Sequence, residues 1–137
     1  MAAGVVYTTD ATVVGHADLA GFFVDWPSPP SPERHLELLR GSDHVVLARE
    51  GEDGRIVGFV TAISDGVLSA FIPLLEVLPE RQGLGIGSEL VRRVLAELEG
   101  LYMVDLMCDP ELQPFYERFG LTPLSGMGVR RYDVLRK

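Results

Sequence analysis

The sequence predicts a single mixed α/β (α+β) domain over residues 1–137, with a twisted mixed sheet flanked by helices. Apolar runs of strand length alternate with segments whose apolar residues recur at helical spacing. The early strands are joined by short turns, which favours antiparallel pairing, whereas a later strand–helix–strand segment favours a parallel crossover. The chain is also long enough to bury one substantial core.

The first half of the chain predicts two helices and three strands around a proline-rich loop. Prolines within Trp26–Pro32 exclude a helix or a central strand there. Ser31 is a good N-cap, and Pro32 suits the first position of the helix that follows. The expected elements are a strand over 4–8, helices over 16–24 and after 31, and strands over 45–49 and 56–64.

The second half begins with Asp65-Gly66, a tight-hairpin signal that leads into a long strand over 67–78. Pro73 within this strand predicts a bulge, an edge or an interrupted ladder. Asp109 resembles an N-cap and Gly120 a C-terminal stop. The remaining expected elements are a helix ending near 99, a strand over 102–107, a short helix between 109 and 120, and a last strand over 129–135.

Composition narrows the class of protein. A net charge of −8 argues against a nucleic-acid partner and slightly favours a cationic acceptor. No apolar run reaches the roughly 18 residues that span a bilayer, so no membrane partner is expected. No signal peptide is evident, and Cys108 is the only cysteine, which excludes an internal disulfide or a cysteine-based zinc cluster. We therefore expect a cytoplasmic protein without a metal.

The segment Gln82–Ser88 carries the strongest chemical signal, because glycines stand at 83, 85 and 87. Backbone N–H groups without a neighbouring Cβ, opening onto a helix N-terminus, form an anion site, most often for phosphate. The segment has no lysine for a nucleotide P-loop, and its glycine spacing departs from the dinucleotide fingerprint. A nucleotide-binding protein of either kind is therefore disfavoured.

This loop resembles the Arg/Gln-x-x-Gly-x-Gly/Ala motif of the GCN5-related N-acetyltransferase (GNAT) family. The strand before it, 75–80, and Phe115–Leu121 resemble the family's neighbouring signatures. The resemblance implies an N-acetyltransferase that binds acetyl-coenzyme A, with the diphosphate on the loop and the pantetheine arm along the strand. The implied cofactor-binding residues are Val77, Leu78, Gln82, Gly83, Leu84, Gly85, Ile86, Gly87 and Ser88.

Amide formation from a thioester needs a neutral amine, an oxyanion donor and a proton for the thiolate. The resemblance makes Tyr116 the leaving-group acid. Glu76 is the candidate general base, although many family members carry their acidic residue two or three positions earlier, where this chain has Leu74 and Pro73. A water chain could replace a side-chain base. Further candidates for the general base, which the sequence does not rank, are His44, Asp65, Asp105 and Asp109.

Other residues have both a structural and a functional reading. Cys108 is interpreted as an inert thiol rather than an acetyl-cysteine nucleophile. Two Pro-x-x-Pro spacings could form a docking site, but a rigid loop is favoured. Arg81, Arg92 and Arg93 are candidate phosphate contacts or solvated helix-face cations. Candidate acceptor contacts, from the family's geometry, are Phe22, Phe23 and Trp26.

The resulting hypothesis is direct acetyl transfer from acetyl-coenzyme A to a primary amine, with a small-molecule acceptor favoured over a protein. The alternative is a non-catalytic acyl-coenzyme A sensor or interaction module with the same fold. Because the last strands of this family often form dimer contacts, a homodimer is one expected assembly.

Overall fold

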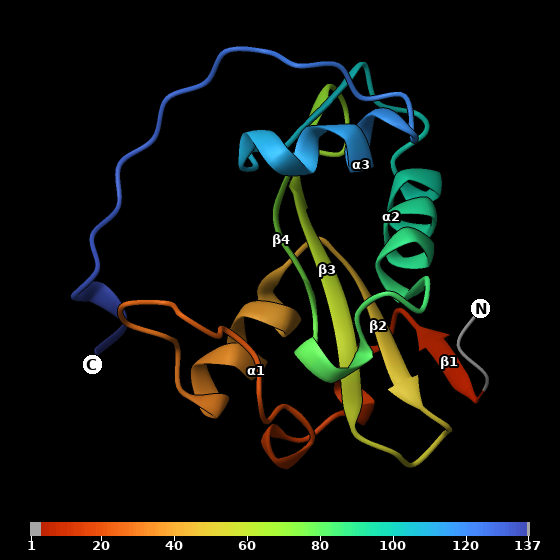
Figure 1. Ribbon diagram of the computed structural model, residues 1–137, viewed down its shortest axis with the longest axis vertical. Coiled ribbons are helices and arrows are strands. Elements are labelled where there is room, and N and C mark those ends of the chain that lie inside the picture. Colours follow the sequence, from red (N-terminus) through yellow and green to blue (C-terminus); the bar gives the residue numbers. More distant parts are fainter. Residues whose placement is uncertain (1–3, 137) are drawn as a thin grey trace.

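The computed structural model describes residues 4–136, in which a central sheet lies between α2 on one face and α1 on the other (Figure 1). The strands are Val5–Thr8 (β1), His44–Glu50 (β2), Ile56–Ser64 (β3), Ser69–Val77 (β4) and Met103–Asp105 (β5). The α-helices are Pro32–Gly41 (α1), Ile86–Glu97 (α2) and Gln113–Glu117 (α3). Single 3-10 turns cover Ala11–Val13, His16–Asp18, Pro79–Arg81, Pro110–Leu112 and Val134–Arg136.

The sheet follows the chain in the order β1-β2-β3-β4-β5. The first four strands pair antiparallel, and β4 pairs parallel with β5 after the crossover through α2. The predicted mixed sheet with one parallel crossover is therefore confirmed.

Two apolar clusters hold the layers together, one on each face of the sheet. Side chains alternate along β2, as they must in a strand. Val46 and Ala48 join the cluster beneath α2, whereas Val45 and Leu47 join the cluster that includes Leu39 of α1. The helical stripe of α2 supplies Ile86, Leu90 and Val94 to the first cluster.

Several local signals have the predicted effect. The Ser31 hydroxyl accepts a hydrogen bond from the Arg34 N–H at 3.2 Å and caps α1. Pro73 lies in a bulge, because two residues of β4, Ile72 and Pro73, stand opposite one residue of β3 between the pairs Thr61–Leu74 and Ile63–Phe71. The pairing of β4 with β5 ends at Phe71, directly before this bulge.

The predicted helix over 16–24 is wrong. Beyond the turn His16–Asp18 the chain is irregular, and Gly21, Phe23 and Asp25 have φ values of 95°, 62° and 68°. An α-helix cannot include these left-handed residues. The helix-like spacing of the apolar residues instead belongs to an irregular loop that packs on the core, where Phe23 is buried.

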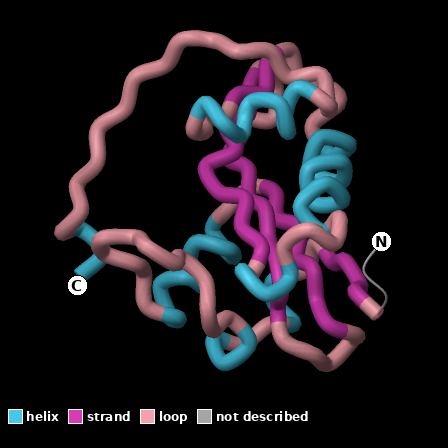
Figure 2. The backbone as a smooth tube through the Cα atoms, in the orientation of Figure 1, coloured by secondary structure: helices cyan, strands magenta, loops and turns pink. Residues whose placement is uncertain are grey.

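The predicted strand over 129–135 is also wrong, and β5 is shorter than the predicted strand over 102–107. No strand of the described residues lies beside 129–135, and a strand needs a partner for its backbone groups. Residues 122–134, here called the C-terminal arm, are instead exposed at every position, and residues 122–131 have no regular secondary structure. Figures 1 and 2 show the chain leaving the body beyond α3 and running in a long arch toward the C-terminus.

Among residues 4–136, no helix is both long and apolar enough to cross a bilayer.

Candidate active site

The site begins where β4 and β5 separate. These two strands pair only from Ser69 to Phe71 of β4, with Met103 to Asp105 of β5. After the bulge, the edge of β4 from Leu74 to Val77 that faces β5 has no strand partner among the described residues. Backbone N–H and C=O groups there are available to an extended ligand that carries amides of its own.

The glycine loop follows β4 and begins α2, as predicted. Gly83 and Gly85 have φ values of 80° and 88°, and Gly85 is the N-cap of α2 without any side-chain cap. A Cβ at either glycine would meet no atom within 4 Å, so the space beside the loop is open. Exposed amides at the positive end of a 12-residue helix therefore form a cradle for an anion.

The other predicted loop residues divide into two groups. The Gln82 side-chain amide donates a hydrogen bond to the Val77 carbonyl at 3.1 Å and ties the loop to the end of β4. Leu84 is exposed, whereas Leu78 and Ile86 bury their side chains in the core beneath α2. Leu78 and Ile86 can therefore contribute to a ligand only through their backbone.

The three arginines that the sequence places near the loop each pair with a carboxylate. Arg81 pairs with Glu50, and Arg92 and Arg93 both pair with Glu89 on the outer face of α2. These three contacts support the solvated-face interpretation of the arginines.

Arg118 is the cation that sequence reasoning missed. Its guanidinium lies 3.5 Å from the Ser88 hydroxyl in the first turn of α2 and packs over the ring of Phe115. This arginine could hold a phosphate at the loop. The signal that could have identified it is its place in the second family motif, two residues after Tyr116.

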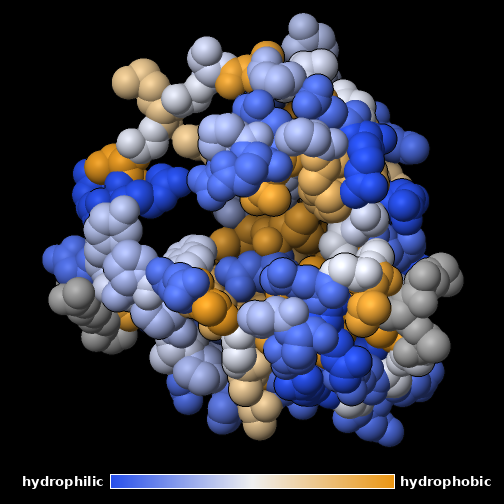
Figure 3. All heavy atoms as spheres, viewed as in Figure 1, coloured by the Kyte–Doolittle hydropathy of each residue, from blue (hydrophilic) through white to orange (hydrophobic). Residues whose placement is uncertain are grey.

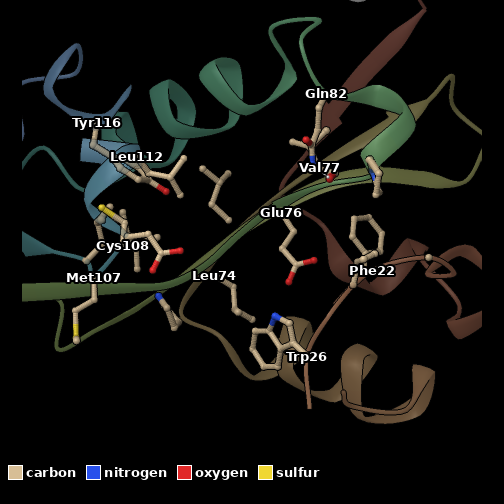
Figure 4. A pocket seen from close by; sticks show the side chains of 18 of the residues that line it. Phe22, Trp26, Leu74, Glu76, Val77, Gln82, Met107, Cys108, Leu112 and Tyr116 are labelled. Atoms are coloured by element: carbon tan, nitrogen blue, oxygen red, sulfur yellow. Dashed lines mark hydrogen bonds between the residues drawn. The ribbon is translucent and has the colours of Figure 1, made fainter. Parts of the chain in front are cut away.

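Glu76 points into the space beside β4 (Figure 4). Its Oε1 accepts a hydrogen bond from the Phe23 N–H at 2.9 Å, which holds the left-handed turn of the N-terminal loop against the strand. Burial raises the pKa of this carboxyl, and the Phe23 hydrogen bond opposes the shift only in part. A carboxylate whose pKa is raised is a stronger base than an exposed one.

Tyr116 comes from α3 and forms the opposite wall (Figure 4). Burial, with a contribution from the neighbouring Cys108, raises the pKa of its phenol to about 12. The phenol is therefore protonated at neutral pH and can donate. Burial and the nearby acidic residues Asp109 and Glu111 also raise the pKa of the Cys108 thiol, which opposes a reactive thiolate.

These side chains line one open cleft with a volume of about 600 Å³. Figure 3 shows apolar side chains exposed within a hollow near the middle of the molecule. Phe22 and Trp26 line the cleft from the N-terminal loop, but Phe23 is buried beneath it. The cleft thus joins a β4 edge, an acidic side chain and a phenol.

The remaining candidate bases lie in other settings. His44 pairs with Glu97 at 2.9 Å, and Asp65 accepts three backbone N–H groups in the β3–β4 hairpin. Asp109 lines the cleft, whereas Asp105 lines a second groove beyond β5. Within residues 4–136, no cluster of three or more His, Cys, Asp or Glu side chains could hold a metal ion.

Comparisons of the sequence and of the structure with known proteins all give acetyltransferases. The model of the acetyltransferase (GNAT) family matches residues 11–121. A rice protein named serotonin N-acetyltransferase 2, chloroplastic, is 36% identical over 94 residues, which are 66% of this chain and 47% of that protein. The chain thus spans about half the length of this relative.

Solved structures resemble nearly the whole chain. A Deinococcus radiodurans R1 protein, provisionally named an acetyltransferase, is 51% identical with a TM-score of 0.92, covering 97% of this chain and 92% of that one. A GNAT-family acetyltransferase from Streptococcus pneumoniae TIGR4 is 26% identical with a TM-score of 0.74, covering 93% and 98%. The Deinococcus alignment omits only about four residues (3% of 137), so it includes most of the C-terminal arm.

Proposed function

This chain belongs to the acetyltransferase (GNAT) family, and on that premise we propose that it transfers an acetyl group from acetyl-coenzyme A to a primary amine. The observation that carries the proposal is one cleft lined by the free edge of β4, the Glu76 carboxylate and the Tyr116 phenol. The glycine loop lies at the end of β4, next to this cleft. Each of these features suits one requirement of thioester aminolysis.

The residues present fit the cofactor. The open amides of Gly83 and Gly85 would hold its diphosphate, with Arg118 as a neighbouring cation. The backbone from Leu74 to Val77 would pair with the amides of its pantetheine arm. Acetyl-coenzyme A supplies an activated thioester when it is bound.

Tyr116 acts at the departing sulfur. Its phenol, with a pKa raised to about 12, holds a proton at neutral pH and donates it from Oη as the carbon–sulfur bond breaks. Cys108 takes no covalent part, because the raised pKa of its thiol keeps it protonated. Transfer to the amine is therefore direct.

Glu76 acts at the acceptor nitrogen. One carboxylate oxygen is held by the Phe23 N–H, and the side chain lines the same cleft as Tyr116. The carboxylate accepts the amine's proton, directly or through a water molecule, as the carbon–nitrogen bond forms. The proton lost by the amine at Glu76 and the proton gained by sulfur from Tyr116 balance the reaction.

The acceptor side of the cleft favours a small amine with an apolar body. Phe22, Trp26 and Leu74 line this side beside Glu76. Such walls would bury an aromatic or aliphatic body while its amino group approaches the carboxylate. The rice relative named for serotonin acetylation supports an arylalkylamine among the first acceptors to test.

The test is thiol release from acetyl-coenzyme A over a panel of arylalkylamines, polyamines, aminoglycosides, amino acids and peptides. We expect turnover with at least one amine class and saturation by both substrates. Binding of coenzyme A without turnover by any acceptor would instead favour the non-catalytic sensor.

A further inference from the structure

The N-terminal loop contains the strained backbone of this structure. Phe23 and Asp25, with φ values of 62° and 68°, are the only non-glycine residues in the left-handed region among residues 4–136. This conformation is unfavourable for a residue with a side chain and persists only where the surroundings hold it. The strained residues lie within 22–26, here called the acceptor turn, whose members Phe22 and Trp26 line the cleft beside Glu76 (Figure 4). Contacts from elsewhere in the molecule must therefore hold this turn.

The acceptor turn is tied to the sheet through a candidate catalytic group. None of the described strands or helices includes residues 22–26. Within the turn, the Trp26 N–H donates to the Phe23 carbonyl at 3.2 Å. The Phe23 N–H donates out of the turn, to the Glu76 carboxylate at 2.9 Å. The position of the turn and the position of the Glu76 carboxylate are therefore linked.

His35 of α1 supports the acceptor turn by ring contacts. Its ring centroid lies 5.5 Å from that of Phe22 and 4.8 Å from that of Phe23, edge-on in both pairs. The ring also lies 4.7 Å from that of Phe59 in β3. Aromatic rings at these separations attract one another beyond the burial of their surface. One side chain thus contacts the ring that lines the cleft and the residue whose backbone N–H holds Glu76.

Helix α1 fixes His35 in turn. Its backbone N–H donates to the Ser31 carbonyl at 2.8 Å in the first turn of the helix, which the Ser31 hydroxyl also caps. The side chain is buried, and its Nε2 has no partner among residues 4–136. Burial also lowers the pKa of the ring, so the ring is neutral at neutral pH and packs as an uncharged aromatic group. A helix therefore presents a fixed, buried ring to an irregular turn.

We infer that His35 is a positioning residue for the acceptor half of the cleft. Its ring keeps Phe22 at the acceptor wall and keeps the Phe23 N–H where it holds the Glu76 carboxylate. A smaller side chain at position 35 would leave space into which both phenylalanine rings could turn, and this movement would relax the strain of the turn. The link to catalysis rests on the proposed function, whereas the support of the acceptor turn does not.

The cofactor half of the cleft lies outside these contacts. The glycine loop begins α2, whose buried side chains join the apolar cluster on one face of the sheet. Phe23 and Phe59 belong to the cluster on the other face. A change at His35 should therefore affect the acceptor and leave the affinity for coenzyme A as it is.

The first test needs no acceptor. Trp26 is the single tryptophan of the chain and lies edge-on to Phe23 at 4.9 Å, so its fluorescence reports the acceptor turn. We expect His35→Ala to shift the emission maximum to longer wavelength and to raise the acrylamide quenching constant. Leu98→Ala, at a buried residue of the cluster beneath α2, is the control for lost stability and should change neither. Natural fluorescence in folded His35→Ala would overturn the inference.

The second test is kinetic, with tryptamine as the acceptor probe. We expect His35→Ala to lower kcat/KM for tryptamine by about tenfold or more, because small displacements of a catalytic group are costly. Coenzyme A affinity should stay natural, and Leu98→Ala should keep both values. His35→Leu, which nearly keeps the volume of the side chain, should restore most of kcat/KM. His35→Val replaces His35→Ala in both tests if the alanine variant does not fold. An equal loss of kcat/KM in Leu98→Ala would contradict a positioning role.

A double-mutant cycle shows whether His35 acts through Glu76. In a Glu76→Gln background no carboxylate is left to take the proton, so His35→Ala should lose most of its effect on kcat. The same effect on kcat in both backgrounds would overturn the part of the inference that concerns Glu76. If the natural chain acetylated no amine, the proposed function would fail, and the Trp26 fluorescence would still decide whether His35 holds the turn.

Discussion

At the scale of single residues, the cleft depends on groups whose local environment suits one task each. Glu76 is half-buried and tied to the Phe23 N–H, so its carboxylate is both positioned and made more basic. Tyr116 is half-buried on the other wall, so its phenol stays protonated. Two titratable groups in one cleft, one poised to accept and one to donate, form an acid–base pair.

Glu76→Gln should separate catalysis from stability. An amide oxygen can still accept from the Phe23 N–H, but the side chain can no longer take a proton. We expect turnover to fall by about 10²-fold or more, with coenzyme A affinity retained. Since burial raises the pKa of Glu76, its ionised form disfavours the folded state at neutral pH. The thermal unfolding midpoint at pH 7 should therefore be no lower in the variant.

Glu76→Ala is the contrasting variant, because it also removes the acceptor for the Phe23 N–H. It should lose stability as well as activity, since a backbone donor in a strained turn loses its partner. Full activity in Glu76→Gln would exclude a proton-accepting role.

Gly85→Ala tests the loop at the motif position that takes only glycine. The added methyl would stand in the open space beside the loop, where it meets no atom within 4 Å. That space is where the diphosphate is to lie, so we expect coenzyme A affinity in calorimetric titration to fall by at least about tenfold. Gly66→Ala, at a φ of 75° and also without an atom within 4 Å, is the control for the strain of a left-handed alanine. Unchanged affinity in folded Gly85→Ala would place the diphosphate elsewhere.

Sequence reasoning identified the residues that belong to local motifs and missed those that depend on tertiary placement. Glycines at alternating positions before a helix indicate an exposed loop in any fold. Arg118 reaches the loop only because α3 packs beside the start of α2, and spacing along the chain does not reveal that contact. Phe23 was expected at the acceptor, yet the left-handed turn directs it into the core.

At the scale of elements, predictions held where a start or stop residue fixed the conformation. Ser31 caps α1, and Pro73 lies in a bulge directly after the last pair of β4 with β5. The predicted helix over 16–24 failed because apolar residues three and four apart also occur in a loop that packs on a core. The predicted strand over 129–135 failed because no strand of the described residues lies beside it to pair with its backbone groups.

The contact between α1 and the N-terminal loop should depend on pH through His35. His35 is 1% exposed among Phe22, Phe23 and Phe59, and its Nε2 has no hydrogen-bond partner among residues 4–136. Burial lowers its pKa to about 4, from 6.5. Between pH 6.5 and about 4, the His35 ring is therefore protonated in the unfolded chain but neutral in the folded chain.

Stability should thus be complete above pH 6.5 and decline toward pH 4, with His35 accounting for up to about 3 kcal/mol of the loss. His35→Leu should flatten this decline in urea unfolding measured from pH 7 to pH 4.5. His16→Leu, at an exposed position, should leave the decline as it is. An equally steep decline in His35→Leu would assign the acid sensitivity to other groups.

At the scale of the whole molecule, the fold brings three separated parts of the chain to one cleft. The N-terminal loop supplies the acceptor wall, β4 and the glycine loop supply the cofactor wall, and α3 supplies Tyr116. The motif segments between residues 75 and 121 made this family assignment predictable. The acceptor wall was less predictable, because it is built from irregular backbone whose course depends on Glu76 and the core.

The central claim is that Tyr116 gives its proton to the thiolate in this cleft, and one measurement tests it most directly. Turnover of Tyr116→Phe is compared with that of Tyr102→Phe, a control at a tyrosine that is 86% exposed, alongside coenzyme A affinity for both. We expect Tyr116→Phe to lose about 10²-fold or more in turnover while its coenzyme A affinity is nearly unchanged, and Tyr102→Phe to match the natural chain. Equal turnover in the two variants would contradict the claim.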